Sequence, residues 1–301
     1  MVFFNELAHM PHFSPAEVDA CRQIVTLALA EDLGAAGDRT SSALIPATQL
    51  GRAAFVARSA GVIAGLPTTT LVCAAVDPQL SIEVHVPDGT AFTGRNKLAT
   101  VTGPLRSILI AERTALNFLQ RLSGVATLTR KYVEAVAGQK AKVLDTRKTT
   151  PGWRLLEKYA VRMGGGTNHR MGLYDGILIK DNHLAGLGDP ATAVRRAVEL
   201  ARTHPGNVGL PVEVEVDTLE QLEQVLGVRP EIVLLDNMPP ELLRKAVARR
   251  DALSPTTQLE ASGGVNLTTI RAIAETGVDR ISVGALTHSA AALDIGLDYA
   301  S

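Results

Sequence analysis

The chain has 301 residues, of which 46% are hydrophobic and only 4% aromatic, and its formal net charge at pH 7 is −1. This length suits one large and one small domain, and an aliphatic composition is typical of α/β layers. The near-neutral charge excludes a general basic surface for nucleic acid or an anionic membrane, so any cationic site must be local.

The cysteine usage and the N-terminal segment bear on the compartment. Cys21 and Cys73 belong to no CxxC or Cys/His cluster, which argues against a structural zinc site and a disulfide framework. The opening residues MVFFNELAHMP lack the basic and apolar regions of a signal peptide. No apolar run approaches the ~18 residues of a membrane span. We therefore expect a cytoplasmic protein without a membrane or nucleic-acid partner.

The first part of the chain is predicted to be a mixed α+β domain. Apolar residues at helical spacing predict a helix over 15–31. Strands are expected within 51–65, 81–86 and 98–103, where turn residues separate apolar runs. Residues 106–137 then predict one or two helices that lead into the next domain.

From about residue 140, apolar runs alternate with amphipathic helices. The expected strands are 142–145, 175–179, 212–216, 231–235, 258–261 and 279–283. The clearest helices are 153–163, 190–201 and 239–250. Repeated strand–helix units predict a parallel sheet, and six in series favour a barrel. Because fewer than eight strands are evident, an incomplete or distorted parallel α/β barrel is as well supported as a complete one.

Polar residues and glycines lie at or just after the C-terminal ends of these strands, where parallel barrels build their active sites. They are Arg147, Lys148, Lys180, Asp181, Glu215, Asp236, Asn237, Ser262, Gly263, Gly264 and Gly284. A solvated loop explains any one of these residues, but explains the whole set much less well.

Two glycine-containing turns near the end of the chain are candidates for phosphate binding. SGGVN (262–266) and VGALTHS (283–289) follow the last two strands, where barrels often hold a phosphate on backbone N–H groups. Ordinary βα turns are the alternative. Neither a P-loop nor a dinucleotide-binding motif is present.

The predicted rim carries two kinds of charge. Its cationic or hydrogen-bonding members are Arg147, Lys148, His169, Arg170 and Lys180. Glu215 and Asp236 are carboxylates from consecutive strands, which could share a hydrated Mg²⁺ or hold ribose hydroxyls. Ion pairs across the barrel mouth are the competing interpretation.

The segment MGGGTNHRMG (163–172) joins a predicted helix to the His169–Arg170 pair. Gly164 is expected to cap the helix. Gly165 and Gly166 would let the chain turn closely enough to present His169 and Arg170 to the barrel mouth. Because the strand positions place the phosphate site at SGG and VGA, this segment is left as a candidate carboxylate clamp.

Several segments resemble quinolinate phosphoribosyltransferases. They are EDLGAAGDRTS (31–41), ERTALNFLQRLSG (112–124), DTRKTTPGWR (145–154) and MGGGTNHRMGLYDGILIKDNH (163–183), followed in the family's order by VEVEVDTLEQ, VLLDNM, LEASGGV and ISVGALTHS. The resemblance implies an incomplete α/β barrel over 119–286 and an N-terminal α+β sandwich over 1–118, on which residues 287–301 would pack. It also implies a homodimer or hexamer with a shared active site.

The resemblance further implies an activity and its residues. Quinolinate and phosphoribosyl pyrophosphate would give nicotinate mononucleotide, pyrophosphate and CO₂, with Mg²⁺ as cofactor. The implied substrate-binding residues are Arg113 from a neighbouring subunit, Thr146, Arg147, Lys148, His169, Arg170, Lys180, Glu215 and Asp236. Lys148, Lys180, Glu215 and Asp236 would be catalytic, and Glu215 and Asp236 would face the metal. The 5-phosphate would bind Ser262, Gly263, Gly264, Val283, Gly284 and Ala285.

Three other functions remain open at this stage. One is a related phosphoribosyltransferase that acts on nicotinate or another aromatic acid. The second is an aldolase-type barrel enzyme that forms a Schiff base on Lys180. The third is a sugar-phosphate sensor without catalytic activity.

Overall fold

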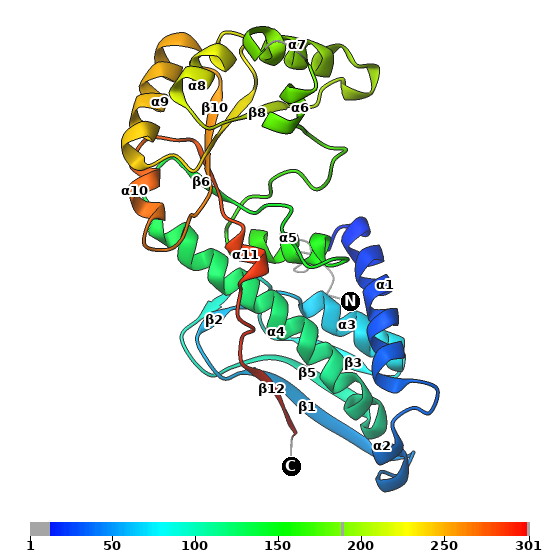
Figure 1. Ribbon diagram of the computed structural model, residues 1–301. Helices are drawn as coiled ribbons and strands as arrows, with labels where there is room; N and C mark the ends of the chain where they lie inside the picture. The colour runs from blue at the N-terminus through cyan, green and yellow to red at the C-terminus, as the bar shows by residue number, and fades with distance from the viewer. Residues whose placement is uncertain (1–12, 188–189, 300–301) are drawn as a thin grey trace, which may run out of the picture. The chain divides into compact units, whose positions relative to one another are not determined.

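The computed structural model describes residues 13–187 and 190–299, which form two compact units (Figure 1). Unit 1 consists of Met1–Arg130, Thr149–Gly165 and Leu286–Ser301, and unit 2 of Lys131–Lys148 and Gly166–Ala285. Residues 1–11, in which the sequence predicts no signal peptide, lie outside the described ranges. Among the helices of the described ranges, none is both long and apolar enough to cross a bilayer.

Unit 1 contains a four-stranded antiparallel sheet. Its order is β12 (Ile295–Tyr299), β1 (Leu50–Ala57), β5 (Asn96–Pro104) and β3 (Ser81–Val84). Phe55 of β1 lies opposite Leu297 on one side and Ala99 on the other. The end of the chain therefore returns to pair with the first strand.

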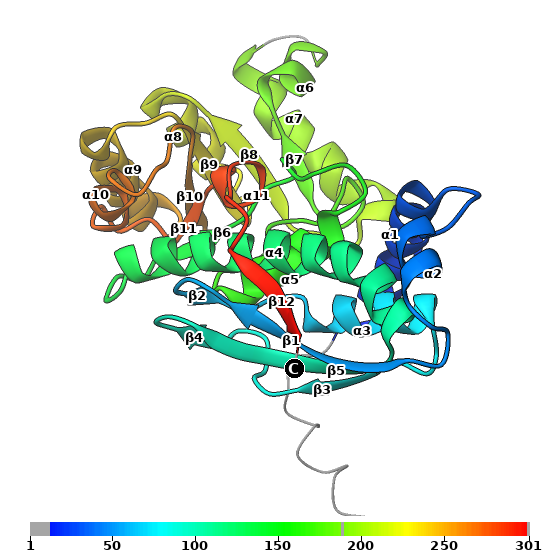
Figure 2. The same ribbon diagram turned by 90° about the horizontal axis from the view of Figure 1, so that it is seen from below.

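The long helix α4 (Leu105–Ala135) lies across one face of this sheet (Figures 1 and 2). A Cβ at Gly124 would meet the carbonyl oxygen of Ala291 at 2.1 Å, so only glycine allows the segment before β12 to pack here. Gln120 fixes the same approach, because its Nε2 donates to the carbonyl of Ile295 at 2.6 Å.

The other elements of unit 1 are short or flank the sheet. They are α1 (Pro15–Leu33), α2 (Arg39–Leu44), α3 (Leu66–Val76), α5 (Arg154–Met163), β2 (Gly61–Val62) and β4 (Ala91–Phe92). Ser14 and Glu17 form a capping box at the start of α1, which explains why the helix begins at Pro15. Helix α11 (Ala285–His288) joins unit 2 to the final segment.

Unit 2 is built on a six-stranded parallel sheet. Its order is β6 (Lys142–Leu144), β11 (Arg280–Ser282), β10 (Gln258–Ser262), β9 (Ile232–Asp236), β8 (Val212–Val216) and β7 (Ile177–Ile179). In the described residues β6 and β7 pair with no further strand on their outer sides, so the sheet does not close. The predicted fold class, an incomplete parallel barrel with an N-terminal α+β part, is confirmed.

Helices connect the parallel strands in unit 2 (Figure 1). They are α6 (Asp181–Ala185), α7 (Pro190–Thr203), α8 (Leu219–Leu226), α9 (Pro240–Leu253) and α10 (Ile270–Ala274), with a 3₁₀ turn at Pro205–Asn207. Thr218 and Gln221 form a capping box at α8, which places the helix directly after β8.

The alternation of side chains along β8 and β10 determines what faces the interior of the open barrel. In a strand, successive side chains point to opposite faces. Val212, Val214 and Val216 of β8 therefore share one face, and Glu213 and Glu215 share the other. On β10, Glu260 lies on the same face as Ser262.

The triple-glycine segment leads from α5 to the edge of the parallel sheet. Gly164 caps α5 as predicted, but Gly165 is the residue with the left-handed conformation, at φ +91°. Thr167 then forms a parallel bridge with Leu144 of β6, and its N–H donates to Val143 at 2.8 Å. The segment 166–172 thus begins by extending the sheet beyond β6.

Candidate active site

A cavity of about 520 Å³ opens at the C-terminal ends of the parallel strands. Its lining residues all belong to unit 2. They are Thr146, Arg147, Lys148, His169, Arg170, Leu178, Lys180, Glu215, Leu234, Asp236, Asn237, Glu260, Ser262, Gly263, Gly264 and Ser282. One chain therefore brings together most of the residues that the sequence predicts for the site.

Four of the predicted site residues do not line this cavity: Arg113, Val283, Gly284 and Ala285. Arg113 is exposed on α4 in unit 1, and within the described ranges it makes no hydrogen bond or ion pair. The N–H of Val283 already donates to the carbonyl of Leu144 at 2.9 Å, so it has no hydrogen left for a phosphate.

The sequence patterns did not indicate four of the lining residues: Leu178, Leu234, Glu260 and Ser282. The sequence carries a usable signal for Glu260, which lies two residues before the predicted Ser262 and therefore on the same face of the strand. The register also places Glu260 directly opposite Leu234 and Arg280.

The Asn168–His169–Arg170 segment is attached to β6 through Asp145, which is fully buried. Oδ1 of Asp145 accepts from the N–H of His169 at 2.9 Å, and Oδ2 accepts from Nδ2 of Asn168 at 2.5 Å. On the other side, Asp175 accepts the N–H groups of Met171 and Gly172 at 2.7 and 2.8 Å. The segment is therefore held by side chains at both ends.

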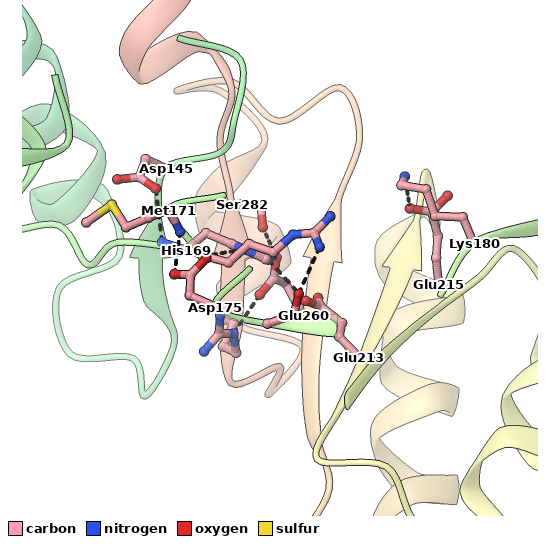
Figure 3. Close-up of polar contacts among 12 residues, drawn as sticks. Asp145, His169, Met171, Asp175, Lys180, Glu213, Glu215, Glu260 and Ser282 are labelled. Atoms are coloured by element: carbon pink, nitrogen blue, oxygen red, sulfur yellow. Dashed lines mark hydrogen bonds and ion pairs between the residues drawn. The ribbon is translucent and has the colours of Figure 1, made fainter. Parts of the chain in front are cut away.

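The imidazole of His169 lies between two buried carboxylates (Figure 3). Its Nε2 is 3.2 Å from Oε2 of Glu213 and 3.3 Å from Oε1 of Glu260. Burial disfavours the charged ring, but the hydrogen bonds to Glu213 and Glu260 outweigh this effect and raise the pKa of His169 to about 9.

The other ring nitrogen of His169 is also engaged. Nδ1 accepts from the N–H of Arg170 at 2.7 Å, a contact that requires Nδ1 to carry no proton. The two carboxylates favour a charged ring, and the Nδ1 contact favours a neutral one. The charge of His169 and the backbone hydrogen bond of Arg170 are therefore coupled.

Glu260 is the centre of this cluster. Oε2 accepts from Nε of Arg280 at 2.6 Å, and Oε1 accepts from the hydroxyl of Ser282. Although burial favours the neutral acid, His169 and Arg280 lower the pKa of Glu260. Burial instead raises the pKa of Glu213, whose Oε1 has no hydrogen-bond partner among the residues that the structure describes.

The composition of His169, Glu213 and Glu260 could suit a metal ion. However, the Glu260 oxygens already receive Arg280 and Ser282, and an arginine so close would oppose a second cation. The trio is therefore better described as a hydrogen-bonded cluster. A smaller cavity of about 190 Å³ lies beside it, lined by residues that include Glu213, Arg280 and Asp175.

Arg147, Lys148 and Arg170 make part of the cavity wall cationic. Nη1 of Arg170 donates to the carbonyl of Gly176 at 3.0 Å, which fixes the guanidinium. Burial and the neighbouring charge of Arg147 lower the pKa of Arg170. Two like charges held close together provide a binding site for an anion, and planar guanidinium groups match carboxylates in particular.

Carboxylates occupy another part of the wall. Lys180 forms an ion pair with Glu215, apart from the His169 cluster (Figure 3). Asp236 accepts from Nδ2 of Asn237 at 2.7 Å through Oδ2, while Oδ1 accepts no hydrogen bond from residues in the described ranges. Asp236 therefore fits a hard cation, whereas Glu215 would first have to share or release Lys180.

Ser262, Gly263 and Gly264 form a turn whose backbone approaches Asn237. The N–H of Asn237 donates to the carbonyl of Ser262 at 2.8 Å, and both residues 237 and 263 have positive φ angles. A Cβ at Gly263 would lie 2.2 Å from Oδ1 of Asn237, whereas one at Gly264 would meet nothing within 4 Å. Only glycine therefore fits at 263.

Comparison with known protein families accounts for nearly the whole described chain. Residues 125–298 match the C-terminal domain of quinolinate phosphoribosyl transferase, and residues 38–123 match its N-terminal domain. The chain belongs to the quinolinate phosphoribosyltransferase family. The resemblance of the TRKT and GGGTNHR segments to this family is thereby confirmed.

Relatives in this family resemble the chain over most of their own length. The nicotinate-nucleotide pyrophosphorylase [carboxylating] of Mycobacterium leprae is 48% identical over 95% of this chain and 99% of its own. A probable enzyme of the same name from Bacillus subtilis is 42% identical over 89% of each chain. The solved structure of the Francisella tularensis nicotinate-nucleotide pyrophosphorylase has a TM-score of 0.86 and 40% identity, covering 94% of this chain and 97% of that one.

Proposed function

We propose that the protein is a quinolinate phosphoribosyltransferase that converts quinolinate and phosphoribosyl pyrophosphate to nicotinate mononucleotide, pyrophosphate and CO₂, in the biosynthesis of NAD. The observation that carries the proposal is the divided wall of the cavity. Arg147, Lys148 and Arg170 offer one side to carboxylates, and Glu215 and Asp236 offer the other to a sugar. The proposal also rests on membership of the family and on relatives named for this reaction.

The proposed reaction begins when the ring nitrogen of quinolinate attacks C1 of the ribose and the bond to pyrophosphate breaks. The transition state carries positive charge on the sugar, so positioning and electrostatics matter more than a covalent nucleophile. Glu215 and Asp236 would stabilise this charge, and Lys148 and Lys180 would attract the departing pyrophosphate. The 5-phosphate would bind the Ser262–Gly264 turn.

Decarboxylation follows in this scheme from the chemistry of the product ring. Once the ring nitrogen is quaternised, the bond from C2 to its carboxylate breaks and leaves an electron pair on C2 that the adjacent positive nitrogen stabilises. CO₂ departs, and C2 takes a proton from solvent. Arg147 and Arg170 would hold the carboxylates until this step.

Mg²⁺ is the proposed cofactor. When bound, it would neutralise charge on the diphosphate, as it does in sites built from one or two carboxylates and substrate phosphates. Asp236 is the better placed of the two predicted ligands, because its Oδ1 is available among the described residues. We also infer a cytoplasmic homo-oligomer, a dimer or hexamer, in which Arg113 of one subunit completes the site of another.

The alternatives differ in their use of the same cavity. A Schiff-base enzyme would need a desolvated lysine or one beside another cation, but Lys180 is 43% exposed and paired with Glu215. A phosphoribosyltransferase for nicotinate would need one carboxylate contact fewer. A sugar-phosphate sensor would bind its ligand without turnover.

The test is a pyrophosphate-release assay with quinolinate and nicotinate side by side, combined with measurement of CO₂. Release of both products with quinolinate alone supports the proposal. Pyrophosphate release only with nicotinate would identify the related transferase, and borohydride trapping of a substrate on Lys180 would identify the Schiff-base enzyme. Ligand binding without any release would identify the sensor.

A further inference from the structure

Glu213 and Glu260 are buried carboxylates that contact His169 from two different strands. We propose that they are positioning residues, which hold His169 and thereby set the place of Arg170 for binding the carboxylates of quinolinate. This inference rests on the proposed function. It assigns to the two carboxylates a role that is exerted through His169.

His169 is fixed both at its ring and at its backbone. Its side chain is 10% exposed, its ring is held at Nε2 by both carboxylates, and its backbone N–H is held by Asp145. Arg170 is the next residue in the chain. A shift of the His169 backbone therefore moves the start of Arg170, and a rotation of the His169 ring breaks the contact between Nδ1 and the N–H of Arg170.

The carboxylate of Glu260 is held rigidly as well. Its oxygens receive Arg280 and Ser282 in addition to His169, and both donors come from the adjacent strand β11. Glu260 and Arg280 are also register partners in the sheet. Hydrogen bonds to a charged carboxylate are stronger than those to a neutral amide. A glutamine would therefore hold the ring less firmly while keeping nearly the same shape.

A competing electrostatic effect predicts the opposite result. Glu260 lines the cavity, so its negative charge could repel a dicarboxylate, and Glu260→Gln would then improve quinolinate binding. However, Nε of Arg280 is 2.6 Å from Oε2 and screens this charge at close range. Loss of positioning should therefore exceed any gain from reduced repulsion.

The experiment compares Glu260→Gln and Glu213→Gln with a matched control, Glu157→Gln. Glu157 is also a fully buried carboxylate with several donors, among them Arg121 at 2.7 Å and the hydroxyl of Thr150 at 2.8 Å, but it lies in unit 1 and does not line the cavity. We expect the Glu260 and Glu213 variants to raise the KM for quinolinate about tenfold, and that for phosphoribosyl pyrophosphate by less than about twofold. The control should lower thermal stability without this selectivity.

A double variant tests whether Glu260 acts through His169. Glu260→Gln combined with His169→Gln should impair quinolinate binding no more than His169→Gln alone, because contacting residues are not additive. Full additivity, an unchanged or lowered KM for quinolinate in Glu260→Gln, or equal rises in both KM values would each overturn the inference.

The KM of a Ser282→Ala variant and the backbone amide shift of Arg170 provide two independent tests. If Glu260→Gln does not fold, Ser282→Ala loosens the same carboxylate by removing one donor and should give a smaller rise in the same KM; no rise would overturn the inference. If the wild-type protein releases no pyrophosphate with quinolinate, the proposed function is refuted instead. In that case the backbone amide shift of Arg170 still decides the positioning role, since it must change in Glu260→Gln and stay unchanged in Glu157→Gln.

Discussion

Nε2 of His169 lies 3.2 Å from Oε2 of Glu213, and both side chains are at most 10% exposed. The same nitrogen also contacts Glu260. Because two carboxylates hold the His169 ring, the protonation of His169 should affect the stability of the folded protein. His169 lies in the chain segment after β6, Glu213 in β8 and Glu260 in β10, so the contact among the three side chains depends on the fold.

The stability of the protein should depend on the charge of His169. The pKa is raised from 6.5 to about 9 in the folded state, so the stabilisation is fully present below about pH 6.5 and is lost as the pH rises through about 9. Urea unfolding between pH 6 and pH 10 should show this loss in the wild type but not in His169→Gln. Parallel curves for the two proteins would contradict it. The ¹⁵N shifts of the ring would show which nitrogen loses its proton.

Arg170→Ala should impair quinolinate binding selectively. The guanidinium lies beside Arg147 in the cavity wall, and a charge-assisted contact to a carboxylate contributes about 1.5–3 kcal/mol, which corresponds to a rise in KM of roughly tenfold to a hundredfold. The KM for phosphoribosyl pyrophosphate should change little. Arg202→Ala, at an arginine that bonds the carbonyls of Val228 and Arg229 outside this cavity, is the control. Equal effects on both substrates would argue against a carboxylate clamp.

Mixing two chains that are each impaired in quinolinate binding should restore activity at low quinolinate concentration if subunits share their sites. Arg113 is exposed in unit 1, and Arg170 lines the cavity in unit 2. Mixed oligomers of Arg113→Ala and Arg170→Ala chains contain some sites with neither substitution. In a randomly mixed dimer, about half of the dimers are mixed and each has one intact site of two, so about a quarter of the wild-type activity is expected. Verified mixed oligomers without any recovery would exclude a shared site.

Asp236→Asn should weaken the dependence of turnover on Mg²⁺. Asn keeps the shape of the side chain but removes the charge from the oxygen that accepts no hydrogen bond in the described ranges. We expect the Mg²⁺ concentration for half-maximal rate to rise about tenfold or more. Substituting a residue that only hydrogen-bonds to a metal ligand already weakens metal binding by about this factor. Asp19→Asn, on the exposed face of α1, should leave the titration unchanged. An identical titration for both variants would remove Asp236 from the proposed metal site.

Gly263→Ala and Gly264→Ala should differ in effect although they are neighbours. Gly264 has φ +60° and open space, so alanine there should cost about 1–2 kcal/mol from the left-handed backbone alone. Gly263 has φ +92°, and its new Cβ would lie 2.2 Å from Oδ1 of Asn237, so the loss should reach about 3 kcal/mol or more. Thermal unfolding of the two variants checks this order, and a reversal would mean that the turn adopts another conformation.

The sequence predicted the parallel strands well because each is a short apolar run between polar turns. The run VEVEV coincides with β8, and EIVLL differs from β9 by one residue at each end. Shorter elements carried less signal. Strand β4 has two residues, which is too few for a period, and the eight-residue helix α8 is not among the clearest predicted helices despite the Thr218 capping box.

The sequence by itself determined which residue types lie at the ends of the strands, since strand period and loop position are local properties. It therefore predicted Arg147, Lys180, Glu215 and Asp236 as candidates for one rim. Only the tertiary structure decided that Glu213 and Glu260 meet at a single nitrogen of His169, and that Val283 uses its N–H within the fold. The reason is physical: these contacts join segments far apart in the chain, and their distances depend on sheet register and on the path of residues 166–172, which no local pattern specifies.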